Sequence, residues 1–119
     1  MRTIQNIKKL SNALKKIKSV KAAILFGSYA KGKQRKDSDI DICVITEGED
    51  DSPLELSSEK IDISLFHRLP LTVRYRVFRD GKVIFNKDDR VLTRLKFWTL
   101  KLYLDEKHWR DAFIAKVLS

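Results

Sequence analysis

Two aspartates are the first candidates for chemistry, because they lie one residue apart in a stretch that is otherwise apolar. Asp39 and Asp41 open the segment DIDICVI, in which the side chains alternate between the two faces of an expected strand, residues 39–45. This alternation puts both carboxylates on one face, together with Cys43 and Ile45. Carboxylates that share a face repel each other and lose hydration unless a cation neutralises them. Mg²⁺ would do so, since it binds one or two protein carboxylates together with phosphate oxygens.

A glycine-serine pair precedes the aspartates. Gly27 and Ser28 follow the apolar run 20–26, as expected for a buried strand that leads into a tight turn. A short helix at 28–32 would offer its first backbone N–H groups and the Ser28 hydroxyl to a phosphate. Taken alone, a pair of aspartates is more often a solvated strand end, and a glycine-serine pair is more often a simple turn. Together they predict a site for a metal-bound nucleoside triphosphate. The basic side chains between them would attract its phosphates: Lys31, Lys33, Arg35 and Lys36.

A third carboxylate, Asp62, belongs to the expected strand 60–66, on the same side as Ser64 and Phe66. There Asp62 would lie across the sheet from Asp39 and Asp41. The alternative interpretation is that Asp62 is at the edge of the strand and faces solvent. The acidic group at 47–51 is expected to be solvated. The two histidines, His67 and His108, lack a second ligand at metal spacing, so they are expected to pack or face solvent.

The remaining pattern predicts a mixed α/β protein in which helices flank a small sheet. An amphipathic first helix has apolar residues at helical spacing from Ile4 to Ile17. Segment 71–79 is ambiguous: its alternation favours a β-hairpin, whereas Pro70 and Gly81 suit the start and the end of a short helix. From Val91 onward the spacing predicts a long or broken helical region. Its aromatic residues form either core or a partner surface: Phe97, Trp98, Tyr103, Trp109 and Phe113.

Composition bounds the class of protein. A chain of 119 residues with 43% hydrophobic content predicts one domain over residues 1–119. The net charge of +9 indicates attraction to polyanions without naming one. A single cysteine excludes an internal disulfide, and there is no signal-peptide core and no apolar run long enough for a bilayer, so we expect a cytoplasmic protein. Aromatic and basic residues do not interleave, which argues against single-stranded nucleic acid as partner.

The combined motif resembles a known family. The segments GSYAKG, residues 27–32, and DSDIDI, residues 37–42, are similar to the signature of the minimal nucleotidyltransferases, the MNT or MntA-like antitoxin branch of the DNA polymerase beta superfamily. The segment KIDI, residues 60–63, matches the usual third-acid strand. The resemblance implies the polymerase beta-like fold and favours the helix for segment 71–79. Tyr29 and Lys31 stand where an arginine is frequent, which leaves the choice of nucleotide open.

The resemblance also implies roles and a partner. Gly27 and Ser28, with Lys31 beside them, would hold the triphosphate of ATP, while Asp39, Asp41 and Asp62 would coordinate two Mg²⁺ ions. Asp62 would also help to deprotonate the attacking hydroxyl. The implied reaction transfers AMP to a tyrosine hydroxyl of a HEPN-domain toxin, which the chain would neutralise as its antitoxin. Two rivals stay open, a small-molecule adenylyltransferase and a non-catalytic binding module, and so does homo-oligomerisation.

Overall fold

The computed structural model describes residues 2–27, 32 and 39–118, and side chains from Gln5 onward. Its elements are α1 (Arg2–Lys15), β1 (Val20–Phe26), β2 (Ile40–Thr46), the 3-10 helix η1 (Ser52–Leu56), β3 (Ile61–Leu65), the 3-10 helix η2 (Phe66–Arg68), α2 (Leu71–Asp80), β4 (Lys82–Asn86) and α3 (Asp89–Leu118). The expected short helix at 28–32 and the loop after it lie outside the described residues, apart from Gly32.

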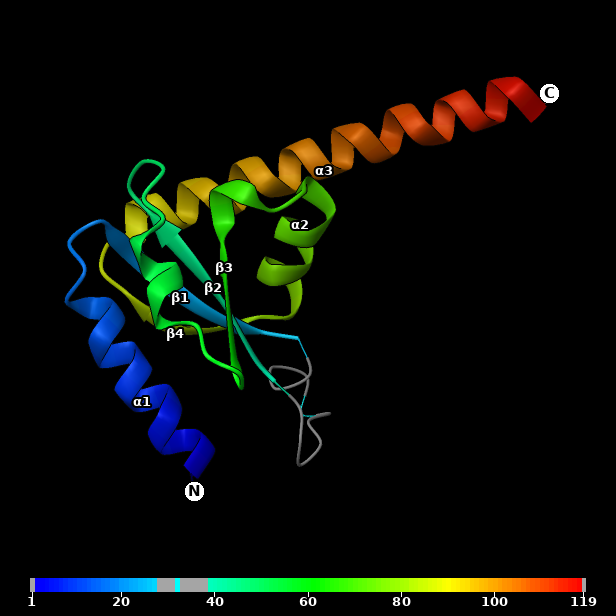
Figure 1. Ribbon diagram of the computed structural model, residues 1–119. Helices are drawn as coiled ribbons and strands as arrows, with labels where there is room; N and C mark the ends of the chain where they lie inside the picture. Colours follow the sequence, from blue (N-terminus) through cyan, green and yellow to red (C-terminus); the bar gives the residue numbers. More distant parts are fainter. Residues whose placement is uncertain (1, 28–31, 33–38, 119) are drawn as a thin grey trace.

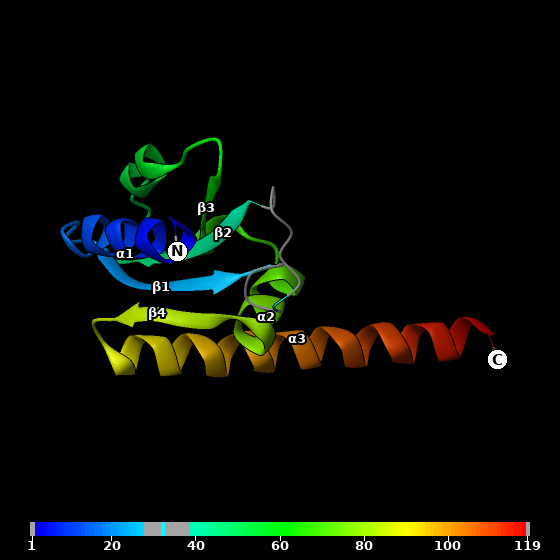
Figure 2. The same ribbon diagram turned by 90° about the horizontal axis from the view of Figure 1, so that it is seen from below.

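The four described strands form one mixed sheet in the order β3-β2-β1-β4. Strand β1 pairs antiparallel with both β2 and β4, and β2 pairs parallel with β3. Helix α1 covers one face of this sheet, and α2 and α3 lie on the other (Figures 1 and 2). The predicted mixed α/β architecture is therefore confirmed, and the single-domain boundary stays a prediction.

Two apolar clusters, one on each face, hold the layers together. The first packs Leu10 and Leu14 of α1 against sheet residues that include Ile42 and Val44. The second packs Val77 of α2, Leu92 of α3 and Phe66 of η2 against the opposite face of the sheet: Ala22, Ile24, Cys43 and Ile45. The alternation predicted for residues 39–45 is confirmed, because Cys43 and Ile45 lie in one cluster while Ile40, Ile42 and Val44 lie in the other.

The hairpin favoured by alternation at residues 71–79 is wrong, since this segment is helix α2. Pro70 precedes the helix, and its carbonyl oxygen accepts hydrogen bonds from the backbone N–H groups of Val73 and Arg74. The residues that pack against the second cluster, Val73, Val77 and Phe78, recur at helical spacing, so burial follows a helical period although the sequence alternates.

The acidic connection between β2 and β3 has a structural function that its composition did not predict. Asp50 accepts hydrogen bonds from the hydroxyl groups of Ser19 and Ser52, and these bonds lower the pKa of its carboxyl group. Arg68 forms an ion pair with Asp51. The segment is thereby tied to the residue before β1 and to η2, and Asp50 and Asp51 are engaged in structure. None of the described helices combines the length and apolar composition needed to cross a membrane.

Candidate active site

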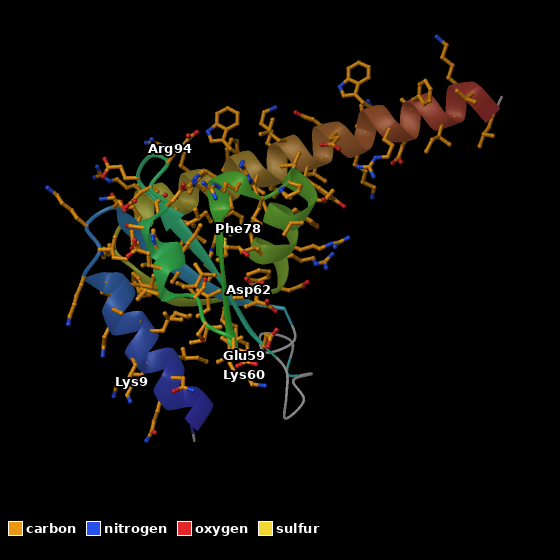
Figure 3. The ribbon with its side chains drawn as sticks, viewed as in Figure 1. Lys9, Glu59, Lys60, Asp62, Phe78 and Arg94 are labelled. Carbon is orange, nitrogen blue, oxygen red and sulfur yellow. The ribbon has the colours of Figure 1, made fainter. Side chains whose placement is uncertain are left out.

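The parallel pairing of β2 with β3 sets two of the candidate acids side by side. Asp41 is the second residue of β2 and Asp62 the second of β3, and the two are direct partners in the register. Partners in neighbouring strands point to the same face of a sheet, with strands spaced about 4.8 Å apart. Asp39 comes directly before β2 and is exposed. Figure 3 labels Asp62 on β3, with Glu59 and Lys60 at the start of that strand.

The end of β1 brings Gly27 against Asp41. Phe26, the last residue of β1, pairs with Asp41 across the antiparallel ladder, and Gly27 follows with a positive φ of 74°. A Cβ atom at position 27 would overlap the Asp41 Oδ2 oxygen and would lie 3.2 Å from the Asp41 Cγ carbon. Only a glycine satisfies both the backbone conformation and this close approach. The predicted glycine and aspartate motifs are therefore joined in space.

Partial burial and neighbouring negative charges act together on Asp41. Its pKa is raised above the ordinary value by partial burial, then by the negative charge of Asp62 and then by that of Asp39. The ion pairs and side-chain hydrogen bonds found between described residues include none of these three carboxylates. The site is thus an acidic cluster whose repulsion a bound cation would relieve.

The donor set fits Mg²⁺. Within the described ranges, no three His, Cys, Asp or Glu side chains are grouped closely enough to hold a metal ion by themselves. Mg²⁺ does not require such a cage, because it retains waters and takes one or two protein carboxylates together with substrate phosphate oxygens. The paired Asp41 and Asp62, with Asp39 within electrostatic reach, supply hard oxygen ligands of that kind. The structure thus brings together Gly27, Asp41 and Asp62, with Asp39 close enough to act on Asp41 through its charge.

The other predicted phosphate ligands, Ser28 and Lys31, lie outside the described residues, as do Lys33, Arg35 and Lys36. Beside Gly27 there is a pocket of about 200 Å³ lined by Phe26, Gly27, Val73, Arg76 and Asp80. Arg76 is exposed and brings a positive charge to the rim of this pocket. Sequence reasoning missed Arg76. The alternation of segment 71–79 suggested a hairpin, and in a hairpin Arg76 would not be expected beside Gly27; as part of helix α2 it lines the same pocket.

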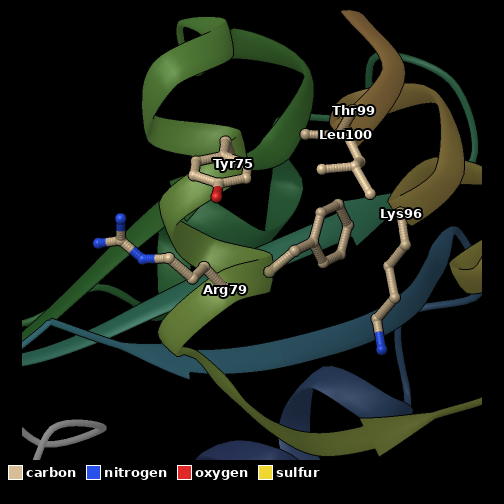
Figure 4. A pocket seen from close by; sticks show the side chains of 6 residues that line it. Tyr75, Arg79, Lys96, Thr99 and Leu100 are labelled. Carbon is tan, nitrogen blue, oxygen red and sulfur yellow. The ribbon is translucent and has the colours of Figure 1, made fainter. Parts of the chain in front are cut away.

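A separate pocket of about 240 Å³ lies between α2 and α3 (Figure 4). Its lining combines Tyr75, Phe78, Arg79, Lys96, Thr99 and Leu100. No carboxylate lines it, so its chemistry differs from that of the acidic cluster. The candidate active site is therefore the region around Gly27, Asp41 and Asp62.

Comparison with known proteins decides the family. The family model described as Polymerase beta, Nucleotidyltransferase matches residues 8–90, which span α1 through β4 and contain all three acids. The chain belongs to the polymerase beta nucleotidyltransferase family. The predicted resemblance to minimal nucleotidyltransferases is confirmed, and so is the enzyme class, a nucleotidyltransferase.

Relatives of this nucleotidyltransferase agree with the assignment. A curated protein of Methanocaldococcus jannaschii, described as a protein adenylyltransferase, is 38% identical over 92 residues, covering 74% of this chain and 68% of the relative. A chain in a crystal structure of a toxin-antitoxin with AMP-PNP has a TM-score of 0.75 at 24% identity and covers 97% of this chain and 98% of its own. A chain in the complex of tri-AMPylated Shewanella oneidensis HEPN toxin with MNT antitoxin has a TM-score of 0.73 at 22% identity, with full coverage of both chains. At these identities the structural likeness establishes the polymerase beta-like fold.

Proposed function

We propose that this nucleotidyltransferase is the antitoxin of a toxin-antitoxin pair and transfers AMP from ATP to a hydroxyl group, a tyrosine, on a HEPN-domain toxin. The single observation that carries the proposal is the packing of Gly27 against Asp41, which stands beside Asp62. The relative described as a protein adenylyltransferase supports a protein as acceptor. The neighbours crystallised with AMP-PNP and with a tri-AMPylated HEPN toxin support ATP as donor and the toxin as acceptor.

In the proposed reaction, an acceptor oxygen attacks the α-phosphorus of ATP and the bond to the β-phosphate oxygen breaks. AMP then remains on the acceptor, and pyrophosphate leaves. Asp39, Asp41 and Asp62 would hold two Mg²⁺ ions. When bound, these ions activate the attacking oxygen and stabilise charge on the leaving pyrophosphate.

The chain's own residues position the reactants and receive the proton. Gly27 and Ser28, with Lys31 close by in the chain, would bind the triphosphate through backbone N–H groups, a hydroxyl and an ammonium group. Gly27 has no side chain, which allows phosphate oxygens to approach the backbone beside Asp41. Asp62 would accept the proton of the acceptor hydroxyl at a carboxylate oxygen.

The experiment follows the fate of each phosphate. Purified chain is incubated with Mg²⁺ and ATP labelled at the α or, separately, at the γ phosphate, with a candidate HEPN-domain protein as acceptor. The variants are Asp41→Asn and Asp62→Asn. The matched control is Glu59→Gln, which removes a neighbouring exposed carboxylate at the start of β3 (Figure 3).

The proposal predicts α label on the HEPN protein, no γ label, loss of at least 10²-fold in rate for each Asp variant, and an unchanged rate for Glu59→Gln. Transfer that continues in both Asp variants would refute the assigned site. Absence of α label on the HEPN protein, with folded chain and Mg²⁺ present, would refute protein AMP transfer.

A further inference from the structure

Helix α3 extends well beyond the body of the protein. It has 30 residues, a length of about 45 Å at 1.5 Å per residue. Figures 1 and 2 both show its C-terminal half projecting past the sheet and past α2. The stacked rings of Tyr75 and Tyr103, whose centroids are 3.8 Å apart, connect α2 to α3 near the point where the projection begins. Every residue from Leu104 to Leu118 is exposed.

One side of this helix is apolar over most of its length, interrupted at Asp105 and Glu106. Val91 and Leu95 pack against the second core cluster. Large apolar residues continue from them at helical spacing, and we call these five the α3 stripe: Trp98, Leu102, Trp109, Phe113 and Val117. The stripe prolongs the side of α3 that is core at its N-terminal end. Trp109 and Phe113 are 72% and 68% exposed, so nothing in the described chain covers that part of the stripe.

The stripe is large enough to be an interface. Buried aromatic side chains each remove roughly 150–250 Å² from water, and the stripe has three of them. Its exposed apolar area is therefore on the order of 600 Å², at the upper limit of the patches that soluble monomers expose. One partner in a standard interface contributes roughly 800 Å², so the stripe with its polar borders is of that size.

Its position relates it to the acidic cluster. Figures 1 and 2 agree that the free half of α3 extends beyond the end of the sheet at which β1 ends and β2 begins. Phe26 at the end of β1 pairs with Asp41 near the start of β2, so this is also the active-site end. A protein seated on the projecting half would therefore lie towards the same end of the molecule as the nucleotide site, with α2 between the two (Figures 1 and 2).

The charge of the chain favours an acidic partner protein over a second copy of the chain as the molecule that binds the stripe. The chain carries a formal charge of +9, while the projecting residues 104–118 are balanced, with three Lys or Arg against three Asp or Glu. The preference therefore comes from the whole chain: two copies, each of charge +9, would repel each other, whereas an acidic partner would be attracted. Two of the acids near the stripe are already paired within the helix, Asp105 with Lys101 and Glu106 with Arg110.

We propose that the α3 stripe is the docking surface for the protein substrate, an acidic protein with an apolar helical face. This inference rests on the proposed function and adds how the acceptor is recognised: the stripe binds the substrate, and the acidic cluster modifies it. The stripe therefore determines affinity for the protein acceptor and leaves affinity for ATP unaffected.

The test compares two double variants with the native chain. Trp109→Ala/Phe113→Ala truncates the stripe. Leu104→Ala/Leu118→Ala truncates exposed apolar residues that lie on the opposite side of the same helix. AMP transfer to the candidate HEPN-domain protein is measured against the concentration of that protein, and MgATP affinity is measured separately. Both tryptophans of the chain lie on the stripe, so 5-fluorotryptophan labelling gives two ¹⁹F signals that report on it directly.

The expected result is a KM for the protein acceptor raised by tenfold or more in Trp109→Ala/Phe113→Ala, since buried aromatic anchors dominate interfaces. MgATP affinity stays unchanged, the opposite-side variant behaves as native, and the ¹⁹F signals shift when the acceptor is added. An unchanged KM, with unshifted ¹⁹F signals during active transfer, would overturn the proposal.

Two further outcomes separate the hypotheses. Should the native chain sediment as a dimer at micromolar concentration and the stripe variant as a monomer, the stripe serves a second copy and the proposal is wrong. Should no AMP be transferred at all, the proposed function fails, and the ¹⁹F shift alone then decides whether the acidic partner docks on α3.

Discussion

Replacing Gly27 by alanine tests whether the close approach to Asp41 matters for catalysis. Gly27 and Gly48 have the same φ of 74°, but a Cβ at Gly48 meets nothing within 4 Å, whereas at Gly27 it overlaps Asp41 Oδ2. Both alanine variants incur the cost of a left-handed backbone, about 1–2 kcal/mol. Only Gly27→Ala also displaces a carboxylate of the candidate site.

The expected magnitudes follow from these contacts. A chain of 119 residues has an unfolding entropy of about 250 cal/mol/K, so each kcal/mol lowers Tm by about 4 °C. Gly48→Ala should therefore lose about 4–8 °C and keep its activity. In Gly27→Ala the Asp41 carboxylate must retreat by about 1 Å to reach ordinary van der Waals contact. A misplacement of that size costs about 10²-fold in rate.

The assay combines thermal unfolding with the rate of AMP transfer, for native protein and both variants under identical Mg²⁺ and ATP. Gly27→Ala should have the lower Tm of the two variants and a rate reduced by about 10²-fold. Equal Tm values and equal transfer rates for Gly27→Ala and Gly48→Ala would refute the reasoning, because the two sites differ chiefly in the contact with Asp41.

Three further outcomes are expected. First, the raised pKa of Asp41 means that the metal-free folded state binds its proton more tightly than the unfolded state, so this group's contribution to stability falls as pH rises from about the ordinary value of 3.8 through the raised value. Asp41→Asn should flatten that fall in pH-dependent thermal melts and should reduce the stabilisation by Mg²⁺; an identical pH profile would contradict the raised pKa of Asp41. Second, Cys43 is fully buried and its pKa is raised to about 12, chiefly by burial, so Ellman's reagent should react with it only as denaturant unfolds the chain; rapid reaction of native protein would disprove this. Third, a Cβ at Gly81 would overlap the Val77 carbonyl oxygen and lie 2.5 Å from Ile24 Cγ2, so Gly81→Ala should cost at least about 2 kcal/mol in urea melts; a cost under about 0.5 kcal/mol would show that the α2–β4 junction adapts.

The elements that the sequence predicted best are those whose burial period is visible within a few residues. The apolar run 20–26 is β1 with the same bounds, because a strand buried on both faces needs continuous apolar residues. The alternating segment 39–45 is β2 shifted by one residue, Ile40–Thr46. The expected strand 60–66 is β3 over Ile61–Leu65, with Asp62 opposite Asp41 as anticipated.

Segment 71–79 shows the limit of reading period alone. In this segment Val and Tyr alternate with Arg, which resembles a strand. In the structure the segment is a helix, and one of these arginines, Arg74, packs inward like an apolar residue. Arg74 donates hydrogen bonds to the carbonyl oxygens of Leu69 and His67, and its guanidinium lies over the Phe66 ring. A search for helical periodicity counts only apolar residues, so it does not recognise a polar residue such as Arg74 that packs inward. The flanking Pro70 and Gly81, together with the resemblance, were the better indicators.

The geometry of the candidate site depends on two facts that no local pattern contains. The acids cluster because β2 and β3 pair in parallel with Asp41 and Asp62 in register, a pairing between residues separated by η1. The contact of Gly27 with Asp41 requires the antiparallel pairing of β1 with β2 and a positive φ immediately after it. Sequence reasoning could name these residues from their types, but their distances come from strand pairing.

The α3 stripe was ambiguous for a different reason, since apolar residues at helical spacing look the same in a core and in an interface. Element lengths show how much of the helix the sheet can cover. The seven residues of β1 span about 23 Å, which is about half of a helix about 45 Å long. About 22 Å of helix must extend past the sheet, which is the length of the exposed segment from Leu104 to Leu118. Because Trp109, Phe113 and Val117 lie beyond the reach of the sheet, they cannot be core of this domain, and their exposure is the reason for proposing that the stripe binds the protein substrate.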